Sequence, residues 1–568
     1  MKLINIEIKK FRSIKQCSFP VKDIMSIVGR NNVGKSSVFR ALNAFFNFEK
    51  EKEFFISGSH EFSNKSQPKI ILTFSDIPDD IKTMFSVVDS LKIQFTYKNN
   101  KKKYSFYNGI KYVDLNDVNL SKIFEKIQFV YIPAVRDYKE ALVDERETIL
   151  KEIINIFLKK HTDKRDVLTP KVKQLEEDFK NVFSKISSEL AKFYFDDKKT
   201  FLKIIPKKEI DYSIILKDLK LQVEEKSAGF DLYDCGSGIQ SMVNIALYRY
   251  LANLNHSNFI VGIEEPENNL HPQLQKKIIK LIKGGRAEKE VQIIFTTHSP
   301  YIIDQLENNE IILLRKEKDV DKKRNFITNF YYFKDSQVPD GRMIKKILNS
   351  EFLFSNLLIV VDGAADIGVI DIILNKNGID CNLKDIDFIS LDGDGSLRYC
   401  YELLESFKIP KIFVVDKDFF LPYFANKKED SRDKKGFFKY KYNYKSSNLA
   451  LIKKIIVSET ERNNLLKYFK SNHSKALDII DKHDFVCANY TLEMDLISSK
   501  SAQNFLYQEL KIPQTEQNTK YLLVNRKNEI KKPELLIKVC KQLNNTNYPG
   551  YLKRIKNLVR KKLKEIES

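Results

Sequence analysis

An octapeptide near the N-terminus restricts what this chain can fold into more than any other feature. Residues 29–36 read GRNNVGKS and match the pattern GxxxxGK[ST]. The apolar run MSIV precedes them, and a segment with helical spacing, SSVFRALNAFFN, follows. A glycine-rich loop between a strand and a helix wraps its backbone N–H groups around phosphates, and the helix N-terminus favours the same anion. The sequence therefore predicts a nucleotide-binding α/β domain.

The residue types of this loop predict distinct roles around a nucleotide. Lys35 is expected to reach the β- and γ-phosphates, and the Ser36 hydroxyl is expected to bind Mg²⁺. ATP and Mg²⁺ are therefore the predicted cofactors of this domain. The other loop residues expected to bind the nucleotide are Gly29, Asn31, Asn32, Gly34 and Ser37.

Two later apolar runs end in residues that suit ATP hydrolysis. The run FIVGI ends at Glu264 and Glu265; the first is expected to orient the metal and the second to polarise the attacking water. The run IIFTT ends at His298, which is expected to sense the γ-phosphate. Adjacent acids at a strand end are often only solvated, but the P-loop upstream argues against that interpretation here.

A fourth element, CGSGIQ at residues 235–240, is followed by a segment with helical spacing. Alone it indicates only a Gly/Ser turn. In order with the other three elements it resembles the signature loop of ABC ATPases, and all four together resemble the ABC ATPases of chromosome maintenance and repair. In that family ATP lies between the P-loop of one subunit and the signature loop of the other. The resemblance implies a homodimer or a higher homo-oligomer, in which ATP is also contacted by Gly236, Ser237, Gly238 and Gln240.

A second α/β pattern begins at about residue 352. The apolar runs LLIVV, IDFISL and KIFVV are separated by segments of helical length, which predicts βαβ units and a parallel sheet. Asp362 and Asp366 follow the first run, LDGDGS closes the second, and Asp416 and Asp418 follow the third. The carboxyl ends of parallel strands share one edge of the sheet, and clustered carboxylates suit Mg²⁺ or Mn²⁺. The sequence thus predicts a divalent-metal site.

The order of these acids resembles the Toprim domain of topoisomerases, primases and certain nucleases. Toprim domains usually place a glutamate, acting as acid/base, where this chain has Asp362. That departure leaves open which group acts as acid/base and whether the domain is degenerate. Asp416 and Asp418 match the Toprim DxD metal pair.

An ABC ATPase followed by Toprim resembles the OLD (overcoming lysogenisation defect) family over nearly the whole chain. The resemblance implies further metal ligands at Glu493 and Asp495 and a late active-site lysine at Lys532, although Lys531 lies beside it. Such a lysine would neutralise phosphate charge in the transition state. The family also implies a role in anti-phage defence.

The predicted fold is α/β with two parts. Residues 1–345 are expected to form the ABC-type ATPase domain, with a helical insertion for dimerisation at about 138–195. Residues 346–568 are expected to form the Toprim domain, a Rossmann-like parallel sheet that ends in a basic helix. That helix could contact nucleic acid, but a solvated helical face is the favoured interpretation.

Charge and composition limit the partners. The formal net charge of +21 favours a polyanion such as nucleic acid, although a lysine-rich proteome would give the same excess. No apolar run approaches the length of a membrane span, and the six cysteines lack metal-site spacing. A cytoplasmic protein without membrane contact is therefore expected.

The leading interpretation is an ATP-regulated, metal-dependent DNA endonuclease. Two alternatives stay open: a nucleic-acid-binding ATPase whose Toprim domain is degenerate, and a nuclease that cleaves RNA. Basic surfaces attract both nucleic acids, and only contacts to the 2′-OH distinguish them. A helicase or a reverse transcriptase of a retron is a further expected partner.

Overall fold

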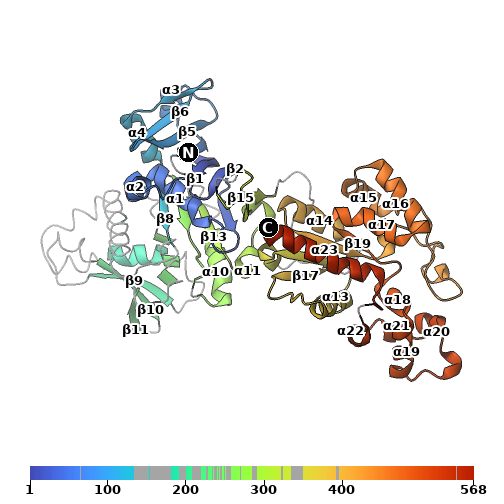
Figure 1. The fold of residues 1–568 in the computed structure, drawn as a ribbon. Helices are drawn as coiled ribbons and strands as arrows, with labels where there is room; N and C mark the ends of the chain where they lie inside the picture. The colour runs from blue at the N-terminus through green and yellow to red at the C-terminus, as the bar shows by residue number, and fades with distance from the viewer. Residues whose placement is uncertain are drawn as a thin grey trace. The chain divides into compact units, whose positions relative to one another are not determined.

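The computed structural model divides the chain into two compact units, Met1–Asp335 and Ser336–Ser568 (Figure 1). The boundary predicted at 345/346 stays a prediction, because residues 334–349 are outside the described part of the chain. Short pieces and single positions between 153 and 250 are described as well. The longer described ranges are 1–63, 66–133, 181–190, 200–206, 219–225, 228–232, 258–268, 270–283, 291–321, 324–333, 350–391, 396–544 and 546–567.

The first unit contains an antiparallel sheet in the order β2-β1-β4-β5-β6-β7. Its residues alternate in burial, as in β5, where Leu91, Ile93 and Phe95 face the core and the residues between them do not. This period of two is the pattern of a sheet with one face packed on a core. The strands are β1 Lys2–Phe11, β2 Ile14–Pro20, β4 Lys69–Ser75, β5 Leu91–Lys98, β6 Lys101–Tyr107 and β7 Tyr112–Asp114.

A second sheet of this unit, in the order β15-β14-β3-β13-β12-β8, carries the predicted nucleotide site. All its strands are parallel except β15, and every residue of β13 is buried, as expected for a strand covered on both faces. The strands are β3 Ile24–Val28, β8 Ile127–Ile132, β12 Asn258–Ile263, β13 Val291–Thr297, β14 Ile311–Lys318 and β15 Phe326–Tyr332. Helices of the unit with described bounds include α1 Lys35–Phe46, α2 Phe48–Ile56, α3 Asp79–Phe85, α4 Asp117–Lys126, α10 Pro272–Lys283 and α11 Pro300–Ile303.

Most of the insertion predicted at 138–195 lies outside the described residues. Residues 181–190 are helical, with Val182, Phe183, Ile186 and Leu190 buried at helical spacing. A small antiparallel sheet follows, formed by β9 Thr200–Pro206, β10 Leu219–Glu225 and β11 Ala228–Asp231.

The second unit is built on a sheet of four parallel strands in the order β17-β16-β18-β19, which confirms the predicted α/β fold with a Rossmann-like sheet. Its strands are β16 Leu357–Val361, β17 Ile386–Ser390, β18 Lys411–Val415 and β19 Phe485–Cys487. Its helices are α13 Ala364–Lys376, α14 Leu397–Ser406, α15 Leu449–Ile455, α16 Glu459–Ser471, α17 His473–Ile480, α18 Leu492–Ile497, α19 Lys500–Glu509, α20 Thr519–Val524, α21 Lys527–Ile530, α22 Pro533–Gln542 and α23 Gly550–Glu567.

The C-terminal helix α23, drawn in red in Figure 1, belongs to the core of this unit. Its apolar side packs against α13, β18 and β19, and Leu552, Ile555 and Val559 are buried. Two of its basic residues form ion pairs within the unit, Arg554 with Asp481 at 3.1 Å and Lys562 with Asp484 at 2.6 Å. Within the described residues, no helix is long and apolar enough to cross a membrane.

Candidate active sites

The P-loop follows β3 and can be built only with glycine at its two ends. Gly29 and Gly34 have φ angles of +154° and +103°, which side chains of L-residues rarely adopt. A Cβ on Gly29 would lie 2.5 Å from the carbonyl oxygen of Leu314, and one on Gly34 would lie 2.7 Å from Ser13 Oγ. The loop is therefore held tightly against its surroundings, and its backbone is fixed for a ligand.

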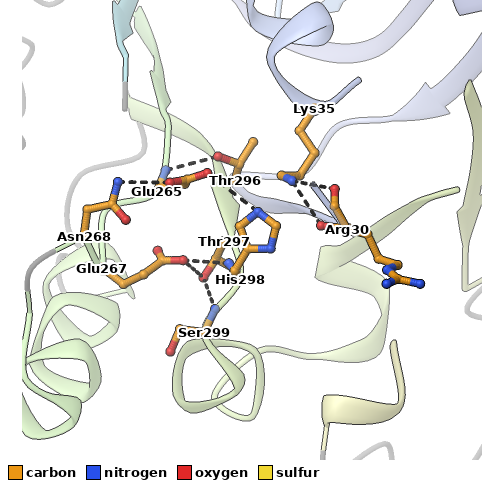
Figure 2. Close-up of polar contacts among 10 residues, drawn as sticks. Arg30, Lys35, Glu265, Glu267, Asn268, Thr296, Thr297, His298 and Ser299 are labelled. Carbon is orange, nitrogen blue, oxygen red and sulfur yellow. Dashed lines mark hydrogen bonds and ion pairs between the residues drawn. The ribbon is translucent and has the colours of Figure 1, made fainter. Parts of the chain in front are cut away.

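Lys35 begins α1 and is buried with only 8% of its surface exposed. Its Nζ donates hydrogen bonds to the carbonyl oxygens of Gly29 and Arg30, at 3.0 and 2.9 Å (Figure 2). Burial lowers the pKa of Lys35 to about 8, while the nearby carboxylate of Glu265 opposes the shift. No side chain of the described residues caps the N-terminus of α1 at Gly34. A phosphate chain fits this cradle, because it would accept both the ammonium protons and the uncapped N–H groups.

The strand order brings together residues that are far apart in sequence. Because β13 lies between β3 and β12, His298 at the end of β13 sits between Lys35 and Glu265. His298 Nε2 lies 3.6 Å from Glu265 Oε1. Burial and the charge of Lys35 lower the pKa of His298, so the imidazole is neutral at neutral pH.

Glu265 is positioned by hydrogen bonds on both its backbone and its side chain. Its N–H donates to the carbonyl and hydroxyl oxygens of Thr296, both at 3.1 Å, and Asn268 Nδ2 donates to its Oε2 at 2.9 Å. Its φ angle of +44° is unusual for a residue with a side chain and shows that these bonds fix a turn. Glu264 is buried beside it, and its N–H donates to the carbonyl oxygen of Ile132 at 2.8 Å.

Glu267 is a residue of this site that the sequence interpretation missed. Its Oε1 accepts hydrogen bonds from Thr297 Oγ1 at 2.8 Å and from the His298 N–H at 2.6 Å (Figure 2). Burial raises the pKa of Glu267. This carboxylate ties the turn after β12 to the end of β13 and so fixes the backbone of His298. The third acid in the run EEPE was the available signal.

The predicted signature loop is described only at its edges. Gln240 Nε2 donates a hydrogen bond to the carbonyl oxygen of Cys235 at 2.9 Å. Gly236, Ser237 and Gly238 lie outside the described residues, so their contacts with ATP remain predictions. Of the other predicted P-loop residues, Asn31, Asn32 and Ser36 are exposed and Ser37 is buried.

In the second unit, carboxylates gather at the ends of the neighbouring strands β16 and β18. Loss of solvent around Asp416, and then repulsion by Asp366, Asp418 and Glu493, raise the pKa of Asp416 well above its usual range. Burial and the charges of Asp362 and Glu493 raise the pKa of Asp366 to about 7, although its Oδ2 accepts a hydrogen bond from the Gly363 N–H at 3.1 Å.

Half-buried carboxylates that repel one another fit a divalent cation, which would offset their charges. Within the described residues, however, no three His, Cys, Asp or Glu side chains are already arranged around one ion position. Residues 392–395, from the LDGDGS run, lie outside that part of the chain. Side-chain rotation, water or substrate oxygens would have to complete the coordination.

Three polar residues extend this acidic cluster. Tyr423 Oη donates a hydrogen bond of 2.7 Å to Asp418 Oδ2, and Lys531 Nζ lies 3.5 Å from Glu493 Oε1. Asp495 is buried, and its Oδ2 accepts a hydrogen bond of 2.6 Å from the Asn489 N–H, so it holds the loop after β19. Sequence reasoning singled out neither Tyr423 nor the contact of Lys531.

Lys531 and Lys532 are both exposed. Lys532 is the N-cap residue of α22. The contact with Glu493 is made by Lys531.

Comparison with known proteins gives matches for both units. Residues 1–90 and 82–303 match the AAA ATPase domain family, and residues 353–418 match the TOPRIM domain of overcoming lysogenization defect protein-like proteins. The chain is 23% identical over 479 residues to the Old nuclease of Escherichia phage P2, covering 74% of this chain and 78% of that protein.

Two further relatives match similar shares of this chain and of their own lengths. The OLD nuclease of Thermus scotoductus is 22% identical over 73% of this chain and 82% of its own length. Endonuclease GajA of Bacillus cereus is 21% identical over 69% of this chain and 70% of its own length. These matches confirm the predicted order of an ATPase domain and a Toprim domain. The chain belongs to the AAA ATPase domain family, and it carries the TOPRIM domain of OLD-type proteins in its second unit.

Proposed function

We propose that this protein is an ATP-regulated DNA endonuclease that depends on a divalent metal and acts in anti-phage defence. The main support for this proposal is the group of carboxylates that repel one another at the ends of β16 and β18. The same chain also contains a complete P-loop. The nuclease names of three relatives, each matched over more than two thirds of its length, support the same function. Metal-dependent cutting that disappears in an Asp416→Ala/Asp418→Ala variant tests it.

In the ATPase unit, each residue contributes through the contacts described above. Lys35 would hold the β- and γ-phosphates of ATP in place of the loop carbonyls, and Ser36 and Glu264 would bind Mg²⁺. Glu265, fixed by Thr296 and Asn268, accepts the proton of the attacking water. Neutral His298 donates a hydrogen bond to the γ-phosphate. A second copy supplies the signature loop, which makes the active form a homodimer or a larger homo-oligomer.

In the second unit, Asp362, Asp366, Asp416, Asp418 and Glu493 would hold Mg²⁺ or Mn²⁺, and Asp495 stays a predicted further ligand. A divalent ion there would generate hydroxide near neutral pH and stabilise the charged oxygens of the phosphodiester. Tyr423 orients the Asp418 carboxylate through its hydrogen bond. Lys531, with Lys532 next to it, neutralises charge on the phosphate.

A second candidate function is a nucleic-acid-binding ATPase with a degenerate Toprim domain. Two observations favour it: Asp362 replaces the usual glutamate, and no three ligands are arranged around one position in the described residues. The intact pair Asp416 and Asp418 and their electrostatic repulsion favour the nuclease. Cutting assays distinguish the two, and an RNA substrate included in them tests the third possibility.

Glu265→Gln is expected to slow ATP hydrolysis by about 10²- to 10⁴-fold, the usual contribution of a positioned general base. Glutamine keeps the size of the side chain and its contact with Asn268 but cannot take a proton. ATP binding is retained, and the dimer with bound ATP accumulates. Phosphate release and size-exclusion chromatography with ATP measure both effects. Glu53→Gln, at an exposed carboxylate of α2, is the control; an unchanged turnover rate for Glu265→Gln would remove the base role.

Tyr423→Phe is expected to raise the metal concentration needed for cutting by about 10- to 100-fold, as loss of a residue that orients a metal ligand commonly does. Phenylalanine keeps the ring stack with Tyr440 and removes only the hydrogen bond to Asp418. A titration of cleavage rate against Mg²⁺ measures the shift. The matched control is Tyr442→Phe, which removes the hydroxyl group of an exposed tyrosine in the same segment. Equal metal requirements in both variants would contradict the positioning role.

A further inference from the structure

The segment between the DxD pair and α15 differs in charge from the rest of the chain. Residues 422–445, here called the arm, contain eight basic and three acidic residues, whereas the whole chain has a net charge of +21 over 568 residues. The arm therefore carries five excess positive charges in 24 residues, and this charge density is several times the average of the whole chain. The lysine-rich composition of the protein does not account for the positive charge of the arm.

The arm has a defined shape. Its two sides are joined by backbone hydrogen bonds from Phe424 N to Lys439 O and from Lys441 N to Pro422 O, both of 3.0 Å. At its tip the Asp433 carboxylate accepts hydrogen bonds from the N–H groups of Lys435 and Phe437, at 2.8 and 2.9 Å. Such a hairpin presents its outward side chains in fixed positions.

The arm is attached directly to the acidic cluster. Tyr423, near its start, donates the hydrogen bond to Asp418, and its ring stacks on Tyr440 with centroids 5.4 Å apart. Arg432 of the arm lines a small cavity together with Lys531 and Glu493. The arm is therefore in direct contact with the carboxylates at which we propose that DNA is cut.

The outer side of the arm carries cations that nothing in the described residues neutralises. Lys434, Lys435, Lys439 and Lys441 are exposed and form no ion pair within the described part of the chain. Phe424 is 55% exposed, and the Lys439 ammonium lies 5.1 Å from the centre of its ring. Unpaired lysines beside an exposed aromatic ring are what proteins use to hold single-stranded nucleic acid, through phosphate contacts and base stacking.

We propose that the arm binds an unpaired stretch of the DNA strand that the Toprim site cuts, with its four exposed lysines on phosphates and Phe424 stacked on a base. This inference rests on the proposed nuclease function. It narrows the substrate to DNA with single-stranded character next to the cut. Blunt duplex DNA offers no free base to Phe424 and is held by the lysines alone.

The test compares two sets of four lysines replaced by glutamine. The arm variant carries the change at Lys434, Lys435, Lys439 and Lys441. The matched control carries it on another hairpin, that of β5 and β6, at Lys98, Lys101, Lys102 and Lys103. Both variants lose the same charge. Their melting temperatures and ATP hydrolysis rates verify that the protein is folded.

Binding of fluorescent single-stranded DNA is measured in EDTA over a series of salt concentrations, so that no cutting takes place. Each phosphate contact contributes about 0.7 to the slope of log affinity against log salt, so the arm variant is expected to lose about 3 from that slope. The control is expected to keep the slope of the wild type. Equal slopes in the two variants would overturn the proposal.

Two further readouts separate this inference from the nuclease proposal. Phe424→Ala is expected to weaken binding of single-stranded DNA about tenfold and to leave blunt duplex binding unchanged; equal effects on both would overturn the stacking role. In cleavage, the arm variant is expected to raise KM and keep kcat. If the wild type binds DNA through the arm but cuts no substrate, the nuclease proposal fails. If the wild type cuts DNA and the arm variant cuts it with an unchanged KM, the arm proposal fails.

Discussion

Lys35→Ala is expected to lower ATP hydrolysis by about 10²- to 10³-fold or more, the loss that follows removal of one charge-stabilising group in a buried site. Lys35 is the ammonium held at the P-loop by the carbonyl oxygens of Gly29 and Arg30. Its burial means that water cannot replace its charge on the phosphates. Phosphate release at saturating ATP measures the loss.

The control is Lys280→Ala, which removes an exposed lysine from α10 in the same unit. It is expected to hydrolyse ATP at the rate of the wild type. Full hydrolysis by Lys35→Ala would show that nucleotide binds elsewhere and that the P-loop assignment is mistaken.

Asp416→Ala is expected to abolish metal-dependent cutting while ATP hydrolysis continues. Asp416 is half-buried, and the charges of Asp366, Asp418 and Glu493 act on its carboxylate, so it is placed to share a cation with them. The charge stabilisation that a bound metal supplies is several kcal/mol, which corresponds to a loss of about 10³-fold or more. Cleavage of labelled DNA in Mg²⁺, measured beside phosphate release, separates the two activities.

Asp416→Asn gives a second readout that does not depend on cutting. Removing one of several mutually repelling carboxylates is expected to raise the melting temperature in EDTA, because the repulsion is no longer balanced by a cation. Glu459→Ala, at an exposed acid of α16, is the control for both measurements. Undiminished cutting by Asp416→Ala would show that the DxD pair is not the metal site.

Sequence reasoning predicted features that depend on local patterns. The P-loop is fixed by glycines whose φ angles the pattern itself requires, and each acidic group directly follows an apolar run that forms a buried strand. In a parallel sheet, those positions share one edge whichever strands are neighbours. The fold class and the general location of both sites therefore followed from the sequence.

Features that depend on strand order and on distant contacts could not be predicted in this way. The position of His298 between Lys35 and Glu265 requires β13 to insert between β3 and β12, an order that differs from their order in the chain. Tyr423 is one of 26 tyrosines, and only the folded arm brings its hydroxyl to Asp418. Lys531 and Lys532 are adjacent and chemically equivalent, and only the turn before α22 determines which one meets Glu493.

The C-terminal helix shows the same limit. Its basic, amphipathic sequence indicated a solvated face and left nucleic-acid contact open. Its apolar side is part of the second unit's core and packs on β18 and β19. A hydrophobic pattern shows that one side of a helix is buried, but it does not show what covers that side.

The most direct measurement is a cleavage assay of the wild type beside the Asp416→Ala/Asp418→Ala variant. Plasmid DNA, linear duplex DNA and RNA are each incubated with Mg²⁺ or Mn²⁺, with and without ATP. We expect the wild type to cut DNA only with a divalent metal and at a rate that ATP changes, and we expect the variant not to cut. Absence of cutting by the wild type on every substrate, or equal cutting by the variant, would contradict this expectation.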